Sequence, residues 1–121
     1  MEQADRRKHS RVETRNSVRY VSISKDGRIV SRSMVRSLNV SRSGLLLETE
    51  HPIEEEYVLL MDADPDSEMI EIMGQLIYCR ETRSGFYQAG ISFIGSEHKK
   101  AKFAVNLIKL YHQKLILQDA A

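Results

Sequence analysis

Short apolar runs, separated by turn-forming residues, fill most of the chain between residues 17 and 93. Glycine, proline or clusters of charge interrupt these runs, for example at residues 25–27, 50–52 and 82–85. Runs this short, bounded in this way, predict β-strands rather than helices. Their spacing favours a small antiparallel barrel or sandwich. We expect six strands, at residues 17–23, 29–38, 44–49, 57–61, 69–78 and 86–93.

The last part of the chain follows a helical period instead. Residues 97–117 contain neither glycine nor proline, and Ser96 precedes them as a candidate N-cap. Apolar side chains recur there with helical spacing at Ala104, Ile108, Tyr111 and Leu115, and the stripe is widened by Phe103, Leu107 and Leu110. A face this broad has to pack against other apolar surface. We expect it to cover the barrel, with dimerisation through the helix as the alternative.

The first 16 residues are polar and lack apolar periodicity, so they predict a mobile arm. The expected organisation is therefore an arm at 1–16, a barrel at 17–95 and a helix at 96–118. A chain of 121 residues forms one domain with a single core. No apolar run approaches the roughly 18–20 residues of a membrane span, and the charged start is unlike a secretory signal. We therefore expect a cytoplasmic protein without a membrane span.

Charge is segregated along the chain, although the net charge is only +1. Residues 1–44 hold 11 Lys/Arg against 4 Asp/Glu, whereas residues 45–75 hold 10 Asp/Glu and no Lys or Arg. Nine of those 11 bases are arginine, the residue best suited to bidentate recognition of phosphate and guanine edges. This distribution predicts a local anion site and not a general attraction to nucleic acid.

The motifs of common enzymes are absent from the sequence. There is no G-x-S-x-G elbow, no glycine-rich phosphate loop with Lys-Ser/Thr and no H-E-x-x-H. The single cysteine, Cys79, excludes an internal disulfide and is expected to be a half-buried structural thiol. The four histidines lack metal-ligand spacing, and the alternating acids at 62, 64 and 66 lack the rest of a calcium loop. We expect no catalytic residues, no metal and no cofactor.

Two polar clusters remain as candidates for binding chemistry. The first is Arg6-Arg7-Lys8-His9-Ser10-Arg11, in which two arginines four positions apart offer rigid guanidinium forks to phosphates and flat bases. The second is Asn39-Val40-Ser41-Arg42-Ser43-Gly44, between two apolar runs. Its Asn and Ser offer donors and acceptors, and Gly44 permits a positive φ or a close approach.

Together and in this order, the two clusters resemble the signature of the PilZ domain family, bacterial receptors for cyclic di-GMP. That signature is an R-x-x-x-R arm followed, after two strands, by [D/N]-x-S-x-x-G. Its positions are filled here by Arg7, Arg11, Asn39, Ser41 and Gly44. Residues 74–80 and 87–93 look like the family's late hairpin, and a closing helix follows, so the resemblance covers about residues 6–115.

The resemblance implies a mostly β fold, a six-stranded antiparallel β-barrel with a C-terminal α-helix and a flexible basic N-terminal arm. It implies that Arg7 and Arg11 meet the guanine edges and phosphates of cyclic di-GMP, because an arginine fork pairs with O6 and N7 together. Asn39 would pair with a guanine and Ser41 would donate to a phosphate or a base. Gly44 would hold the turn and leave room for the ring.

Three further residues take secondary roles in this interpretation. Arg6 adds a cation, Arg42 is a candidate phosphate contact and Tyr78 is a candidate stacking platform. Tyr78 stands where many members of the family carry tryptophan. The implied mechanism is a switch without catalysis, in which the arm orders around the ligand and a downstream protein reads the changed surface in trans.

Two other functions compete with this interpretation. Some relatives with the same fold lack the motifs and serve as protein-interaction modules in motility machinery. A small barrel that binds RNA or single-stranded DNA is the other alternative, but such proteins stack bases on aromatic side chains, and the chain has only 5 Tyr, 3 Phe and no Trp. We expect a monomer or weak dimer that regulates motility or biofilm formation and binds one ligand or an intercalated pair.

Overall fold

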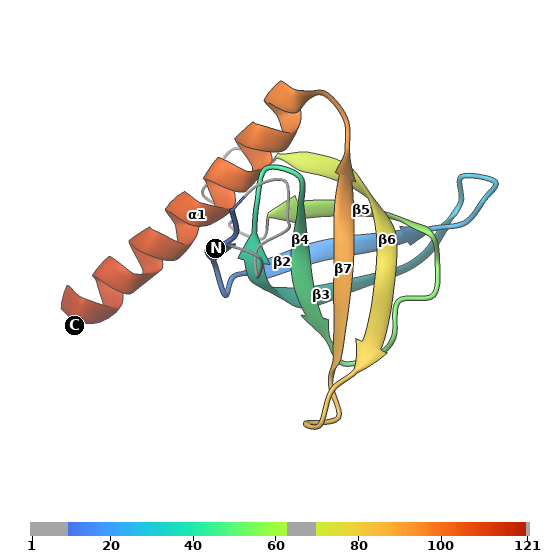
Figure 1. The fold of residues 1–121 in the computed structure, drawn as a ribbon, viewed down its shortest axis with the longest axis horizontal. Helices are drawn as coiled ribbons and strands as arrows, with labels where there is room; N and C mark the ends of the chain where they lie inside the picture. Colours follow the sequence, from blue (N-terminus) through green and yellow to red (C-terminus); the bar gives the residue numbers. More distant parts are fainter. Residues whose placement is uncertain (1–9, 63–69, 121) are drawn as a thin grey trace, which may run out of the picture.

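The computed structural model describes residues 10–62 and 70–120. Within this part the chain forms seven strands followed by one helix (Figure 1). These elements are β1 (Val12–Glu13), β2 (Ser17–Ile23), β3 (Ile29–Val40), β4 (Gly44–Thr49), β5 (Tyr57–Asp62), β6 (Glu71–Glu81), β7 (Tyr87–Ile94) and α1 (Glu97–Ala120). The strands predicted at 17–23 and 44–49 are confirmed to the residue, and the others differ by a few residues at their ends.

Six of the strands close into an antiparallel barrel. Neighbouring strands pair in the order β3-β2-β5-β6-β7-β4, and a further pairing of β4 with β3 closes the ring. Every one of these pairings is antiparallel. The mostly β, six-stranded barrel with a C-terminal helix is therefore confirmed. Closure leaves few free strand edges, which limits edge-to-edge aggregation.

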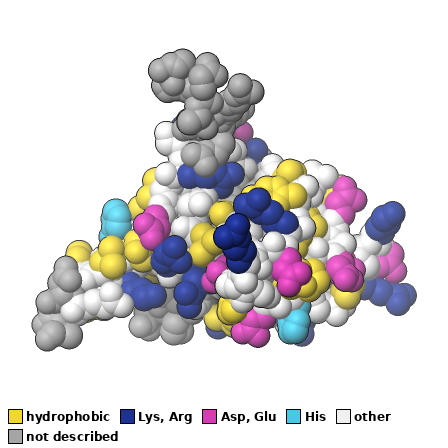
Figure 2. Space-filling view, turned by 60° about the horizontal axis from the view of Figure 1, so that its bottom comes forward, with side chains coloured by type: hydrophobic (Ala, Val, Ile, Leu, Met, Phe, Trp, Pro, Cys, Tyr) yellow, Lys and Arg dark blue, Asp and Glu magenta, His cyan; other side chains and the backbone are white. Residues whose placement is uncertain are grey.

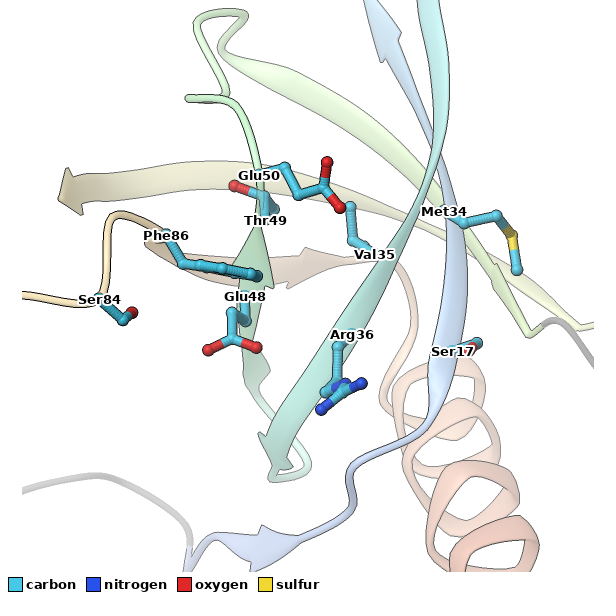
Figure 3. Close-up of a pocket in the computed structure, with 9 residues that line it drawn as sticks. All are labelled: Ser17, Met34, Val35, Arg36, Glu48, Thr49, Glu50, Ser84 and Phe86. Carbon is cyan, nitrogen blue, oxygen red and sulfur yellow. The ribbon is translucent and has the colours of Figure 1, made fainter. Parts of the chain in front are cut away.

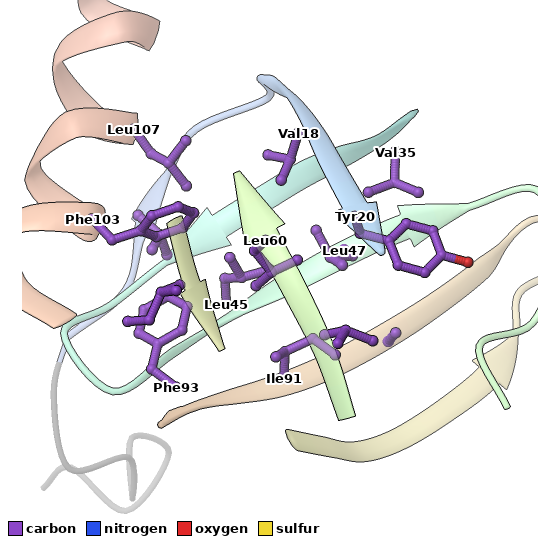
Figure 4. Packing of buried hydrophobic residues seen from close by; sticks show 14 of the residues in the cluster. Val18, Tyr20, Val35, Leu45, Leu47, Leu60, Ile91, Phe93, Phe103 and Leu107 are labelled. Carbon is purple, nitrogen blue, oxygen red and sulfur yellow. The ribbon is translucent and has the colours of Figure 1, made fainter. Parts of the chain in front are cut away.

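The core fills the barrel and the end of the barrel beneath α1 (Figure 4). Alternate residues of each strand point inward, as the period-two pattern requires. The inward set includes Val18, Leu45, Leu47 and Leu60, none of which has exposed surface. Phe103 of α1 meets Phe93 of β7 edge to face, with ring centroids 5.5 Å apart. That geometry is the preferred one for aromatic pairs.

Only the first half of α1 packs against the barrel. Ser96 caps the helix, because its Oγ accepts the backbone N–H of Lys99 over 3.1 Å. Phe103, Ala104 and Leu107 are buried, whereas Leu115, Ile116 and Leu117 are 39%, 66% and 70% exposed. The helix projects beyond the barrel (Figure 1), so the apolar stripe predicted from the sequence is covered at its start and uncovered at its end.

The structure differs from the expected arm at residues 12–16. Residues 1–9 of that arm lie outside the described residues, but β1 pairs with the end of β3, and Thr14 and Asn16 are buried. Thr14 Oγ1 lies 2.9 Å from Ser37 Oγ, and the backbone N–H of Ser37 donates to the carbonyl oxygen of Asn16 over 2.8 Å. Because the buried side chains here are polar, hydrophobic periodicity could not detect the contact.

Candidate ligand-binding site

The second predicted motif forms the turn that joins β3 to β4. The backbone N–H of Ser41 donates to the carbonyl oxygen of Gly44 over 2.8 Å. The hydroxyl of Ser41 accepts the backbone N–H of Ser43 over 3.2 Å and lies 3.1 Å from Ser43 Oγ. Ser41 is only 4% exposed. Its side chain therefore shapes the turn, and the direct ligand contact predicted for it stays a prediction.

Gly44 lies at a close approach between two strands. It pairs with Ser92 of β7, and a Cβ atom at this position would stand 2.2 Å from the backbone oxygen of Ile91. Its φ is not among the positive values found at other glycines. The glycine is therefore required by the neighbouring strand, because no side chain fits beside that oxygen.

The two motifs meet in one hydrogen bond. Arg11 directly precedes β1, and β1 lies along the end of β3 with Glu13 opposite Asn39. Nη1 of Arg11 donates to Oδ1 of Asn39 over 2.9 Å, and both side chains are half-buried. This contact orients the guanidinium, a planar group with five N–H donors. The structure thus brings together the second arginine of the arm and the first residue of the turn.

The segment between Arg11 and β2 is also attached to the helix. The side-chain amide of Asn16 donates to the carbonyl oxygen of Leu107 in α1 over 2.7 Å, and Lys114 Nζ lies 3.4 Å from the carbonyl oxygen of Arg15. Arg15 has a φ of +33°, which is uncommon for a residue other than glycine. The position of Arg11 therefore depends on α1 as well as on β3.

Tyr78 stands beside the same turn on β6. It pairs with Gly90 of β7, and a Cβ atom on Gly90 would lie 2.7 Å from Cε2 of the tyrosine ring. The guanidinium carbon of Arg80 lies 5.9 Å from the ring centroid, within the range of a cation–π interaction. Tyr78 is 45% exposed. Gly90 thus provides the space in which the ring lies, and part of the ring stays open to solvent.

A pocket of about 190 Å³ connects these features. Of the predicted site residues, Arg11, Gly44 and Tyr78 line it. Asn39 adjoins it through Arg11, Ser41 is buried behind the turn, and Arg42 is exposed at the tip of the turn. Arg6 and Arg7 lie outside the described residues. The structure therefore places three of the predicted residues around one cavity and a fourth in contact with it.

Sequence reasoning missed six residues near this pocket. Five of them contribute to its lining, namely Ser43, Ile77, Gly90, Ile91 and Ser92, and Arg80 contacts the Tyr78 ring. Arg80 could have been found, since residues two apart on a strand share a face. Ser92 could not, because only the register of β4 against β7 places it opposite Gly44.

The described residues hold no group of three or more His, Cys, Asp or Glu side chains placed to bind a metal ion. Among the same residues, no helix is both long and apolar enough to cross a membrane. Cys79 is half-buried in β6, as expected from the sequence.

The sequence profile of the PilZ domain matches residues 5–107, which is most of the chain. The protein belongs to the PilZ domain family. The matched span contains both motifs and ends within the packed half of α1. A comparison with curated proteins finds no match.

Solved structures of PilZ proteins share the fold. The PilZ domain of YcgR from Escherichia coli with c-di-GMP aligns with a TM-score of 0.63 at 14% identity, covering 92% of this chain and 98% of that one. MrkH of K. pneumoniae, in a complex with c-di-GMP, aligns with a TM-score of 0.62 at 19% identity, and the alignment covers 91% of this chain and 56% of MrkH. MotI/DgrA, an inhibitor of motility from Bacillus subtilis, aligns with a TM-score of 0.63 at 13% identity, and the alignment covers 91% of this chain and 53% of MotI/DgrA. This PilZ chain thus spans about half the length of the last two proteins.

Proposed function

We propose that this PilZ protein is a receptor for cyclic di-GMP that signals to a protein partner in trans. The observation that carries the proposal is the hydrogen bond from Arg11 to Asn39, which unites the two motifs beside a pocket. Two of the structural neighbours, YcgR and MrkH, were solved with c-di-GMP, which supports the same ligand here.

The residues around the pocket match the chemistry of a guanine nucleotide. The planar guanidinium of Arg11 suits O6 and N7 of guanine or a phosphate oxygen. Asn39 uses its oxygen on Arg11, so its NH₂ group is the part that would donate to the ligand. The exposed part of the Tyr78 ring offers an apolar surface for stacking.

The pocket is smaller than the roughly 300–1,000 Å³ of sites that enclose a drug-sized ligand. It would therefore hold one part of the dinucleotide, and the rest would lie on open surface. Arg7, four positions before Arg11, would close over that part from the arm, with Arg6 and Arg42 adding positive charge. Binding would order the arm, and part of the binding free energy would be spent on that ordering.

The signal would leave the site by two routes. The first is the new surface made by the arm and the ligand, which a partner in a motility or biofilm pathway would recognise. The second is the attachment of residues 15 and 16 to α1 through Asn16 and Lys114. A ligand that shifts Arg11 would pull on the same segment and so bias the position of the helix.

Calorimetric titration with cyclic di-GMP, cyclic di-AMP, GTP and a single-stranded oligonucleotide tests the proposal. We expect cyclic di-GMP to bind at least tens of times more tightly than cyclic di-AMP, because each unpaired polar group costs about 1–3 kcal/mol. Equal affinity for the two dinucleotides would contradict the guanine assignment. Failure of all four to bind would favour a PilZ interaction module, and binding of the oligonucleotide alone would favour a nucleic-acid-binding barrel.

A further inference from the structure

The two ends of β3 have different surroundings. Residues 36–40 pair with β4, whereas residues 29–36 pair with β2 on the opposite side of the strand. No described strand pairs with residues 29–35 on the side that faces β4. β3 runs on past β4 towards the β2–β3 hairpin (Figure 1), so the barrel has one free strand edge at this place.

A continuous groove runs along this edge. Three adjoining cavities of about 430, 130 and 290 Å³ lie between β3 and residues 48–55. The first two share Met34, Val35, Thr49 and Glu50, and the last two share Tyr20, Ser33 and His51. No residue of the groove lines the pocket beside Arg11 and Gly44.

The shape of the groove suits an extended chain. Alternate residues along the free edge present a backbone N–H and C=O that no described strand meets, and an incoming strand can pair with them. Peptides that add a strand to a sheet in this way gain affinity from backbone hydrogen bonds and specificity from alternate side chains. The free segment of seven residues is long enough for a typical strand.

The side chains of the groove indicate what such a strand would carry. Four glutamates line the side of the groove formed by β4 and the segment between β4 and β5, namely Glu48, Glu50, Glu54 and Glu55. None of their side chains forms a hydrogen bond or ion pair with another described residue. Two arginines, Arg32 and Arg36, line the other wall, so the groove is acidic on balance. Figure 2 shows acidic and basic side chains close together on the face of the molecule that it presents.

Apolar surface is present in the first cavity. The ring of Phe86 extends towards Glu48 and Thr49, and Val35 lies on the opposite side, whereas the side chain of Met34 points away from the ring (Figure 3). Phe86 and Met34 are 39% and 56% exposed. An extended peptide with apolar residues at every second position would bury them against the Phe86 ring, and its other residues would face the glutamates.

We propose that this groove binds an extended segment of a partner protein, in which basic and apolar residues alternate, as an additional strand on the free edge of β3. The segment would pair with residues 31–35 and place its basic side chains against Glu48, Glu50 and Glu54. This inference does not depend on nucleotide binding, because the two sites share no residue.

The first test uses two synthetic heptapeptides, one of alternating lysine and valine and one of alternating glutamate and valine. Binding is measured by NMR titration, together with hydrogen exchange of the backbone amides. We expect the lysine peptide to bind more tightly, to shift the signals of residues 31–36 and 48–55, and to slow exchange at alternate amides of residues 29–35. The proposal is wrong if exchange at this edge does not change, or if the glutamate peptide binds equally well.

Charge reversal provides the matched control. Glu50 and Glu54 are exposed, so the double variant Glu50→Lys/Glu54→Lys should keep the thermal stability of the wild type. We expect it to lose about tenfold in affinity for the lysine peptide and to prefer the glutamate peptide. The double variant Glu71→Lys/Glu81→Lys, exposed on β6 and outside the groove, changes the net charge by the same amount and should bind as the wild type does. An equal loss in both variants would show that only net charge matters.

A second copy of the chain is the competing occupant. Sedimentation velocity of the free protein over a range of concentrations separates the two cases. We expect a monomer with fast-exchanging amides on the free edge of residues 29–35. A dimer in which these amides are already protected would overturn the proposal of a basic partner segment.

Discussion

Nη1 of Arg11 donates a hydrogen bond to Oδ1 of Asn39 over 2.9 Å, and this contact joins residues 28 positions apart. Both side chains are half-buried beside the β3–β4 turn. Asn39 therefore acts on a ligand in two ways, through its own NH₂ group and through the orientation of the Arg11 guanidinium. Substitutions of Asn39 can separate these two contributions to ligand affinity.

Replacing Asn39 with Ala removes both contributions. We expect affinity for cyclic di-GMP to fall by about 10- to 100-fold, because hydrogen bonds to charged groups contribute about 1.5–3 kcal/mol. Asn39→Asp keeps an acceptor for Arg11 and removes the NH₂ donor, so its loss should be smaller. Calorimetry measures both variants. An affinity of Asn39→Ala equal to that of the wild type would place the ligand elsewhere.

Substitutions of Arg11 test whether the planar fork or only the charge is required. Arg11→Ala should weaken cyclic di-GMP binding by about 10- to 150-fold, from the loss of charge-assisted hydrogen bonds. Arg11→Lys keeps the charge but loses the bidentate geometry, so we expect it to bind nearly as poorly. Arg83→Ala, an exposed arginine in the β6–β7 turn, is the control and should bind normally. A lysine variant with wild-type affinity would exclude the bidentate mechanism.

Two glycines of the site should respond differently to alanine. At Gly44 the added Cβ would meet the backbone oxygen of Ile91 at 2.2 Å, so strands β4 and β7 would have to separate. We expect a loss of at least about 1–3 kcal/mol in the free energy of unfolding, measured by urea denaturation. At Gly90 the added Cβ meets only the Tyr78 ring, which is 45% exposed and can turn outward. Gly90→Ala should therefore cost less stability and act mainly on ligand affinity.

A buried and an exposed leucine of α1 should contribute differently to the stability of the protein. Leu107 has no exposed surface, so Leu107→Ala should reduce the free energy of unfolding by about 2–5 kcal/mol. Leu117 is 70% exposed on the same helix, and Leu117→Ala should change the free energy of unfolding by less than about 0.5 kcal/mol. Thermal and urea unfolding of both variants measure these changes. A large loss at Leu117 would mean that the projecting end of α1 is covered in solution, as the dimer alternative requires.

The strands and the helix were predictable because the spacing of apolar residues along the chain differs between the two kinds of element. Residues 44–49 alternate between the core and the barrel surface, and Ser96 marks the start of α1 by its capping hydroxyl. The motif residues Arg11, Asn39 and Gly44 were also found in the sequence, because their types, order and spacing resemble the signature of the PilZ family. Their contacts were not predictable in the same way.

The buried segment at Thr14 and Asn16 shows one limit of sequence reasoning. Polar side chains normally indicate solvent, but here Ser37 and the Leu107 carbonyl satisfy them. Those partners are 23 and 91 positions away, and only the folded chain brings them within hydrogen-bonding distance. The role of Ser41 differs, because its hydrogen-bonding partners, Ser43 and Gly44, lie within its own turn.

The sequence by itself determined a mostly β chain with a C-terminal helix and the approximate positions of its elements, because these depend on local periodicity. The barrel and the candidate site residues followed from the resemblance of its motifs to the PilZ family. Only the tertiary structure decided that Arg11 contacts Asn39, that Gly44 is required by Ile91, and that β3 keeps a free edge where it diverges from β4. These features depend on strand register and barrel closure, which are set by contacts between distant residues. No local pattern in the chain encodes them.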